Sequence, residues 1–214
     1  ISAGIQMDDK MLLFKESYVM YTTGDGPTDT GQANDFAPAQ IITSDTGCSN
    51  PRSLVFMPLG VMFKSPKGIY MITRGLQVQY IGAPVERYND LTITSAILVP
   101  KVNEVRFLTL EGPTLVYDYF MDQWGTDEEI AGVDATVYQN TFTYATADGI
   151  VNKETPGTFT DNGQFIPLGL TTGWLSGAGL QAYQRVFDMY LLGEYKSPPQ
   201  LKVTFAYDFN PNPF

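Results

Sequence analysis

One strand cassette recurs along this chain: a run of alternating apolar residues, a short turn, and a second run rich in aromatic residues. It is found as KMLLFKESYVMYTTG from Lys10, GVMFKSPKGIYMITRG from Gly60, EVRFLTLEGPTLVYDYFMDQW from Glu104 and, more loosely, TVYQNTFTYATADGIVNK from Thr136. One phenylalanine marks the corresponding position in each copy, at steps of 49, 44 and 35 residues: Phe14, Phe63, Phe107 and Phe142. A repeat of about 40–50 residues that consists of strands is typical of a β-propeller blade. Because a blade cannot bury both of its faces alone, we expect these units to stack around an axis.

The strand pattern is clearest in the first three quarters of the chain. Residues 5–23 are predicted to form two strands, and residues 53–85 alternate regularly, with a tight reversal at Pro66-Lys67-Gly68. Strands are expected again over residues 91–119, and Asp148-Gly149 predicts a later hairpin.

The amino-acid composition of the chain changes after residue 155. Residues 157–179 are rich in Gly and Thr, and two strands are predicted beyond them, over residues 185–195 and 201–209. The first of these could be a helix by periodicity alone, but Gly193 would weaken a helix. The predicted fold is therefore all-β: a partial β-propeller of antiparallel blades over residues 1–155, and a C-terminal β region over residues 156–214 that closes the propeller or forms a small β-sandwich.

Composition narrows the possible functions. The 214 residues are 43% hydrophobic and 17% charged, which is typical of a folded chain rather than a disordered one. The net charge of −10 disfavours nucleic acid and anionic membranes as ligands. No apolar stretch approaches the roughly 20 residues that cross a bilayer. The chain begins at Ile1, without Met and almost at once in strand-like sequence, so we interpret it as a piece of a longer protein.

Several kinds of catalytic and metal site find no support. The chain contains no His, which excludes Ser-His-Asp and Cys-His catalysis in their usual form. Cys48 is the single cysteine, so neither a disulfide framework nor a zinc site is expected, and we predict a small apolar role for it. No Gly-rich phosphate loop with Lys follows a strand. We expect no cofactor and no metal.

A glycosidase is the remaining enzyme class, because paired carboxylates alone can perform its acid and base steps. The candidate carboxylates are Asp25, Asp29, Asp118, Asp122, Glu128 and Glu129. We favour the interpretation that they lie on solvated turns or strand ends. The segment Ser44-Asp45-Thr46-Gly47 only partly matches the Asp box of sialidase propellers, since its spacing differs and the Trp is missing.

Two further features have both a functional and a structural interpretation. GDGPTDTG, with Asp25 and Asp29, partly matches a calcium loop, but it lacks the third carboxylate and the terminal Glu, so a turn-forming loop is favoured. Trp124 with Tyr117 and Tyr119 could form a platform for sugar stacking. Aromatic residues at alternating strand positions more often belong to a core or to an interface between blades.

Several segments resemble the β-propeller tail proteins of short-tailed bacteriophages. They are DDKMLLFKES, SDTGCSNPRSLVFMPLGVMFKSPKGIYMITRGLQVQYIGAPVE, EVRFLTLEGPTLVYDYFMDQW and the closing stretch from GWLSGAGLQAYQRVFDMYLLGEYKSP to LKVTFAYDFNP. The resemblance runs from about Asp8 to Pro211, and its most specific parts are KGIY…YIGAPVE and QRV…LLGEYKSP.

The resemblance implies a virion structural protein of the tail hub, tail nozzle or packaged-DNA stabilisation type, and not an enzyme. Copies of such proteins form a ring below the portal, continue the channel for DNA and hold tail spikes or fibres. The expected partners are therefore further copies, the portal or adaptor, and a spike or fibre protein, while DNA passes without specific binding. The resemblance carries no catalytic, cofactor-binding or metal residues. The alternatives are a host-receptor or glycan-binding propeller that uses loops such as residues 24–38 and, less favoured, the glycoside hydrolase.

Overall fold

The described residues form an all-β structure with a few short 3-10 helices, which confirms the all-β part of the prediction. The structure is a computed structural model that describes residues 1–31, 35–128, 130–155, 157–158, 160–161, 164–166, 168–175, 187–190, 192–193, 200–206 and 210. It divides into two units, Ile1–Glu154 and Thr155–Phe214. In the described part of the chain, no helix has the length and apolar character needed to cross a membrane.

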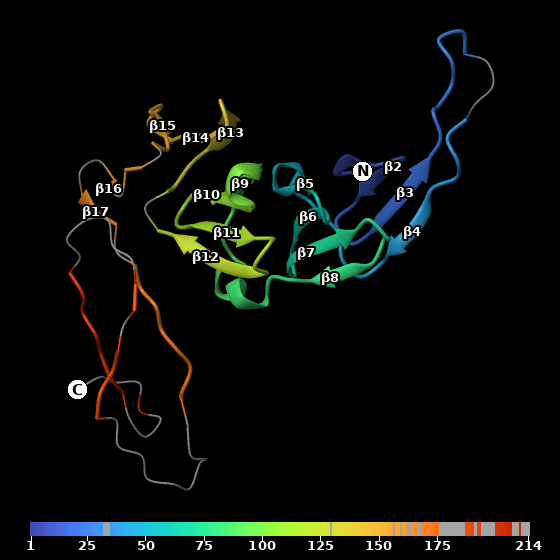
Figure 1. The fold of residues 1–214 in the computed structure, drawn as a ribbon. Helices are drawn as coiled ribbons and strands as arrows, with labels where there is room; N and C mark the ends of the chain where they lie inside the picture. Colours follow the sequence, from blue (N-terminus) through green and yellow to red (C-terminus); the bar gives the residue numbers. More distant parts are fainter. Residues whose placement is uncertain are drawn as a thin grey trace, which may run out of the picture. The chain divides into compact units, whose positions relative to one another are not determined.

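The first unit consists of four antiparallel meanders, in which the order of strands in each sheet follows the chain (Figure 1). The first sheet comprises β1 (Ala3–Met7), β2 (Lys10–Phe14), β3 (Val19–Thr23) and β4 (Gln40–Thr43). The second comprises β5 (Val55–Met57), β6 (Gly60–Ser65), β7 (Gly68–Thr73) and β8 (Val78–Tyr80). The third comprises β9 (Ile93–Val99), β10 (Glu104–Thr109), β11 (Thr114–Asp118) and β12 (Gln123–Asp127), and the fourth β13 (Asp134–Tyr138), β14 (Thr141–Ala145) and β15 (Val151–Lys153). Three short 3-10 helices lie between strands: η1 (Pro51–Ser53), η2 (Ala83–Tyr88) and η3 (Pro100–Val102).

The hairpin between β6 and β7 shows how local sequence sets the register. Ser65 pairs with Gly68, so Pro66 and Lys67 form the two-residue reversal that the sequence predicts. At the other end of β6, Gly60 has a φ of 154°, and a Cβ there would lie 2.0 Å from the carbonyl oxygen of Ile72. Only glycine allows the two strands to approach this closely. The turn at Asp148-Gly149 is longer than the predicted two-residue hairpin, because the Thr146 N–H donates to the Ile150 carbonyl and encloses residues 147–149.

Three apolar layers lie between successive sheets. The second sheet is apolar on both faces: Val61 and Phe63 of β6 pack toward the first sheet, whereas Met62 packs toward the third. The third sheet repeats this arrangement, with Phe107 of β10 toward the second sheet and Leu108 toward the fourth. Alternate residues of one strand therefore serve two different cores, as expected for sheets that stack face to face.

The four phenylalanines of the repeat all lie on the second strand of a sheet, and all are fully buried. Three of them share a direction: Phe63, Phe107 and Phe142 face the preceding sheet. Phe14 instead faces the following sheet, where its ring lies 5.1 Å from that of Phe63. The predicted register of the first copy is therefore wrong by one residue, and Leu13 is the position equivalent to Phe63. The segment MLLF is apolar at four consecutive positions, so its pattern does not distinguish the two faces, and a slip of one residue exchanges them.

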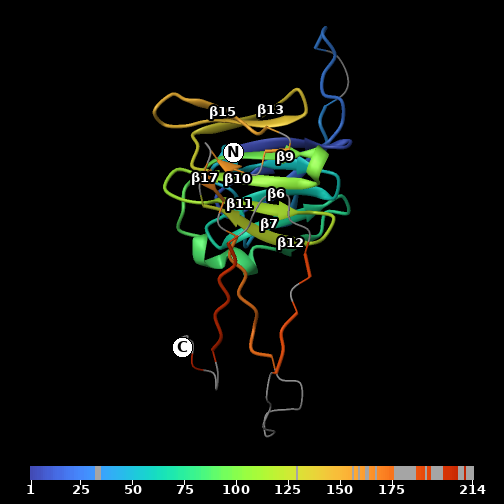
Figure 2. The ribbon, with the colours of Figure 1, turned by 60° about the vertical axis from the view of Figure 1, so that its left-hand side comes forward.

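The sheets are aligned by their first strands, since β1 approaches β5, β5 approaches β9, and β9 approaches β13. Two side-chain hydrogen bonds add to this alignment. Asn50, which caps η1 ahead of β5, donates through Nδ2 to the Ile93 carbonyl of β9 at 2.6 Å, and Ser95 Oγ of β9 donates to Asp134 Oδ1 of β13 at 3.0 Å. The sheets follow one another in a row in Figure 1, and in the turned view of Figure 2 the strands β13 and β15 of the fourth sheet lie above those of the second and third sheets.

The second unit contains one short hairpin, β16 (Thr160–Asp161) and β17 (Gln164–Phe165). The strands predicted over residues 185–195 and 201–209 are not found in their described parts, residues 187–190, 192–193 and 201–206, which have no regular secondary structure. The other residues of these two predicted strands, 185–186, 191, 194–195 and 207–209, lie outside the described residues. An alternating pattern predicts a strand only when another strand is present to pair with its backbone, and the described residues offer none here.

Candidate functional site

The turns that join each odd-numbered strand to the next even-numbered one form the most distinctive region of the first unit. Within a meander these turns lie at the same end of the sheet, because neighbouring strands are antiparallel. We call this set of turns, from β1–β2 to β13–β14, the hairpin end. All six described non-glycine residues with positive φ occur in it: Asp8, Leu76, Asn103, Asp122, Gln139 and Asn140. Such residues tighten hairpins, and a leucine among them (φ 62°) is unusual, because bulky side chains rarely adopt this conformation.

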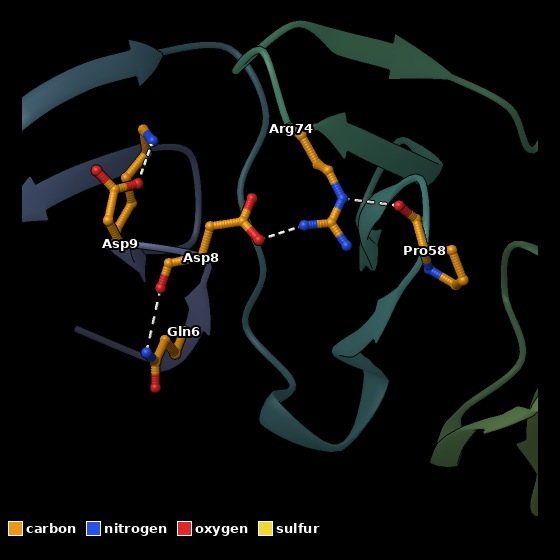
Figure 3. A network of polar contacts seen from close by, with 6 residues as sticks. Gln6, Asp8, Asp9, Pro58 and Arg74 are labelled. Atoms are coloured by element: carbon orange, nitrogen blue, oxygen red, sulfur yellow. Dashed lines mark hydrogen bonds and ion pairs between the residues drawn. The ribbon is translucent and has the colours of Figure 1, made fainter.

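Arg74 joins the hairpin ends of the first two sheets (Figure 3). It lies in the β7–β8 turn, forms an ion pair with Asp8 of the β1–β2 turn, and donates through Nε to the Pro58 carbonyl at 2.7 Å. Its guanidinium also lies 5.1 Å from the centre of the Phe56 ring. The three turns are thereby held together by one side chain with planar, multidentate geometry that Lys could not reproduce.

The β11–β12 turn accounts for two of the predicted catalytic carboxylates. Asp118 Oδ1 accepts from the backbone N–H groups of Phe120 and Met121 at 2.8 and 2.9 Å, an arrangement that forms the turn. Asp122 Oδ1 accepts from the Tyr117 hydroxyl at 2.8 Å. Burial, and then this hydrogen bond with Asp122, raises the pKa of Tyr117 above its usual range. Both carboxylates have structural partners, and the turn presents Phe120, which is 77% exposed, to solvent.

The other predicted carboxylates are not brought together. Asp25 and Asp29 lie exposed in the connection between β3 and β4, and Glu128 lies exposed just after β12. Glu129 lies outside the described residues. Among the residues that the structure describes, no three His, Cys, Asp or Glu side chains are grouped so as to hold a metal ion.

The segment that partly matches an Asp box has a structural arrangement. Asp45 pairs with Lys67 at 2.6 Å on the surface. Gly47 lies so close to the turn after β2 that a Cβ would be 2.1 Å from the Lys15 carbonyl oxygen. Thr46 is buried, and its hydroxyl is the one buried side-chain polar atom without a hydrogen-bond partner in the described part of the chain.

Trp124 lies between the second and third sheets rather than on an open platform. Its ring centre is 5.0 Å from that of Tyr117 and 6.2 Å from that of Phe107. Its Nε1–H donates to the Ile81 carbonyl at 2.8 Å, which ties β12 to the segment that leaves β8. Tyr119, a partly buried neighbour of the same core, donates to Asn103 Oδ1 at 3.2 Å. The aromatic residues proposed for sugar stacking therefore belong to a core between sheets.

Cys48 behaves as the composition predicts, as a small buried side chain. Its thiol donates to the Asn50 carbonyl at 3.1 Å and lies 3.3 Å from Ser53 Oγ. Burial raises the pKa of the Cys48 thiol. A thiol that is buried and protonated near neutral pH is a poor nucleophile.

Arg106 is a polar core residue that no sequence motif indicates. Its side chain is buried between the third and fourth sheets, where it bonds Glu104 and Glu154 at 2.7 and 2.5 Å and lies 4.5 Å from the centre of the Phe142 ring. Burial opposes its charge, but the hydrogen bond with Glu154 and the charges of both glutamates outweigh burial and raise its pKa. On β10, Val105 and Phe107 face the second sheet, so alternation places Arg106 on the opposite face of the strand. That face is covered by the fourth sheet, and the sequence around Arg106 does not indicate this cover.

Negative charge gathers at the hairpin end. The first unit has 19 Asp and Glu against 10 Lys and Arg, so it carries nine of the ten net negative charges. Eight acidic residues lie in or beside the hairpin-end turns: Asp8, Asp9, Asp25, Asp29, Asp35, Glu104, Asp118 and Asp122. Three basic residues lie there, Lys10, Arg74 and Lys101, and the first two are paired with Asp9 and Asp8. The hairpin end is therefore an acidic surface with its basic side chains largely neutralised.

Comparison with models of known protein families and with curated proteins found no match. Among solved structures, one similar to this chain is the crystal structure of the computationally designed Ika4 protein. The two have 14% identical residues and a TM-score of 0.48, over 73% of this chain and 91% of that chain.

Proposed function

We propose that this chain is a structural protein of a bacteriophage virion, part of a ring of copies below the portal of a short tail. Its four sheets are blades of a partial β-propeller. The observation that carries this proposal is the alignment of the first strands β1, β5, β9 and β13, with each sheet packed on the next through its own apolar layer. In a propeller the blades are arranged in this way around an axis, and the result is a rigid wall.

The charge distribution supports a conduit for DNA. Each contact between a Lys or Arg side chain and a phosphate adds affinity, so a basic wall would retain the polymer. The hairpin end is acidic instead, and its Arg74 and Lys10 are held by carboxylates. A wall of this kind repels the DNA backbone and lets it slide through without binding.

The β11–β12 turn offers an attachment point for other tail proteins. Asp118 holds this turn so that Phe120 and Met121 project into solvent, 77% and 57% exposed. Rigid, exposed aromatic side chains are typical anchors of protein interfaces. We expect the portal, an adaptor, a spike or a fibre to use such an anchor.

Negative-stain electron microscopy of the protein over a concentration series tests the proposal. We expect closed particles of several copies with an axial hole. Particles that remain monomeric at every concentration, together with saturable binding of a glycan, would replace the conduit with a receptor-binding propeller.

A further inference from the structure

Each boundary between consecutive sheets of the first unit carries a hydrogen bond from a side chain to a main-chain carbonyl. The donor lies in the stretch that leads into or begins the first strand of one sheet, and the acceptor lies in the corresponding stretch of the next sheet. The three bonds run from Ser2 Oγ to the Cys48 carbonyl, from Asn50 Nδ2 to the Ile93 carbonyl at 2.6 Å, and from Thr94 Oγ1 to the Gly132 carbonyl at 2.5 Å. We call these three bonds the clasps.

The clasps recur with the period of the phenylalanine repeat. Their donors, Ser2, Asn50 and Thr94, follow one another at steps of 48 and 44 residues, against 49 and 44 residues for the first three phenylalanines. Two of the hydroxyls also meet a matching carbonyl on the second strand of their own sheet. Ser2 Oγ lies 3.0 Å from the Phe14 carbonyl oxygen, and Thr94 Oγ1 lies 3.3 Å from that of Leu108. A clasp is therefore part of the repeated unit and not an isolated contact.

The clasps end on buried residues. Cys48 and Ile93 are 0% and 3% exposed, and Gly132 is buried as well. A buried carbonyl that loses a hydrogen-bond donor costs free energy, because water does not replace the donor. The bond from Ser95 to Asp134 at the third boundary differs, since its acceptor is a carboxylate on an exposed residue that water can reach.

The apolar layers alone do not determine how one sheet lies on the next. Burial of apolar surface has no preferred direction. Three methionines, Met57, Met62 and Met71, lie in the layer between the second and third sheets, and their unbranched side chains adapt to small shifts. A hydrogen bond depends on distance and angle. The clasps therefore distinguish one placement of the sheets from others close to it.

We propose that the clasps couple the four sheets, so that the first unit opens as one body and not sheet by sheet. In a stack where each element contacts only its neighbours, a weak interface lets one element open alone. The fourth sheet depends most on its clasp, because the layer beneath it has four buried residues, against eleven between the second and third sheets. This coupling holds whether or not copies of the chain form a ring.

Native-state hydrogen exchange of the full chain, followed by mass spectrometry, tests the inference with three variants. Thr94→Val replaces the clasp hydroxyl by a methyl group of similar size. Thr94→Ser keeps the hydroxyl, and Thr136→Val makes the same hydroxyl-to-methyl change at an exposed site on β13, as the matched control. In Thr94→Val we expect the slowest amides of β13–β15 to exchange roughly tenfold faster, because the fourth sheet then opens alone.

The other sheets and variants decide what the acceleration means. In the unaltered chain, Thr94→Ser and Thr136→Val, the slowest amides of all four sheets should be equally protected, and in Thr94→Val those of β5–β8 should stay as they are. Unchanged exchange in Thr94→Val, or equal acceleration in all four sheets, would overturn the coupling. Acceleration in Thr94→Ser or Thr136→Val would overturn it too, because the effect would then come from packing or from the added methyl group.

A second variant tests the same claim one boundary earlier, and it serves also where Thr94→Val does not fold. Asn50→Asp removes the Nδ2 donor but keeps the side-chain oxygen that accepts from the Arg52 N–H at 3.0 Å. We expect the protection of the first two sheets to separate from that of the third and fourth. Equal protection on both sides of this boundary would contradict the coupling.

Discussion

Replacement of Trp124 by alanine tests whether the sheets are held together through their aromatic cores. Trp124 is half-buried on β12, packs on Tyr117 and Phe107, and donates to the Ile81 carbonyl across the boundary between two sheets. A fully buried Trp or Phe costs about 3–5 kcal/mol when it is truncated to Ala. Half burial reduces the packing part to about 2 kcal/mol, and the hydrogen bond adds about 1 kcal/mol.

We therefore expect Trp124→Ala to lower the free energy of unfolding by about 3 kcal/mol. Trp124→Phe keeps an aromatic ring and loses the N–H donor, so it should cost about 1 kcal/mol. Urea unfolding followed by far-ultraviolet circular dichroism gives these values. Phe120→Ala, an exposed aromatic residue on the same hairpin, is the control and should stay within about 0.5 kcal/mol. A change of less than 0.5 kcal/mol for Trp124→Ala would refute its place between the sheets and revive a surface role in sugar binding.

Three other predictions follow from local geometry and charge. Gly60→Ala should lower the free energy of unfolding by about 3 kcal/mol or prevent folding, because the added Cβ would meet the Ile72 carbonyl. Gly125 has open space around it, so Gly125→Ala is the control and should be near neutral in the same urea assay. The folded thiol of Cys48 has a pKa above its usual 9.0, so the unfolded chain releases this proton first, and the free energy of unfolding should fall as pH rises above about 9. Cys48→Ala should reduce this dependence on pH, and an unchanged dependence would contradict the burial of the thiol. Replacement of Asp25, Asp29 and Asp35 by Lys changes the net charge from −10 to −4 and should create DNA binding that weakens steeply with salt in a filter-binding assay. The unaltered chain should not bind DNA, and strong binding by it would contradict the acidic wall.

The repeat could be predicted from the sequence because each copy of it corresponds to one sheet of the fold. Phe63, Phe107 and Phe142 occupy the second strand of consecutive sheets and face the same way. Phe14 could not be assigned to a face, since an apolar run of four residues has no period. The tight turn at Pro66-Lys67 was predictable because its residues favour one backbone conformation.

The contacts between sheets were less predictable than the sheets themselves. Arg74 and Arg106 have no motif around them, and their partners Asp8 and Glu154 are distant in sequence. Asp118 was predicted as a candidate acid, but its position two residues before an exposed turn residue is that of a turn-forming side chain. In the second unit, residues 201–206 have the pattern of a strand, and a pattern does not say whether the pairing strand belongs to the same chain.

Single-particle cryo-electron microscopy of the assembled protein tests the central claim most directly, namely that copies form a conduit for DNA. The account predicts a closed ring of identical copies, an axial channel wide enough for duplex DNA, and acidic hairpin-end turns such as that of Asp25 along its wall. A closed dimer, a filament without a channel, or a channel lined by Lys and Arg would contradict it.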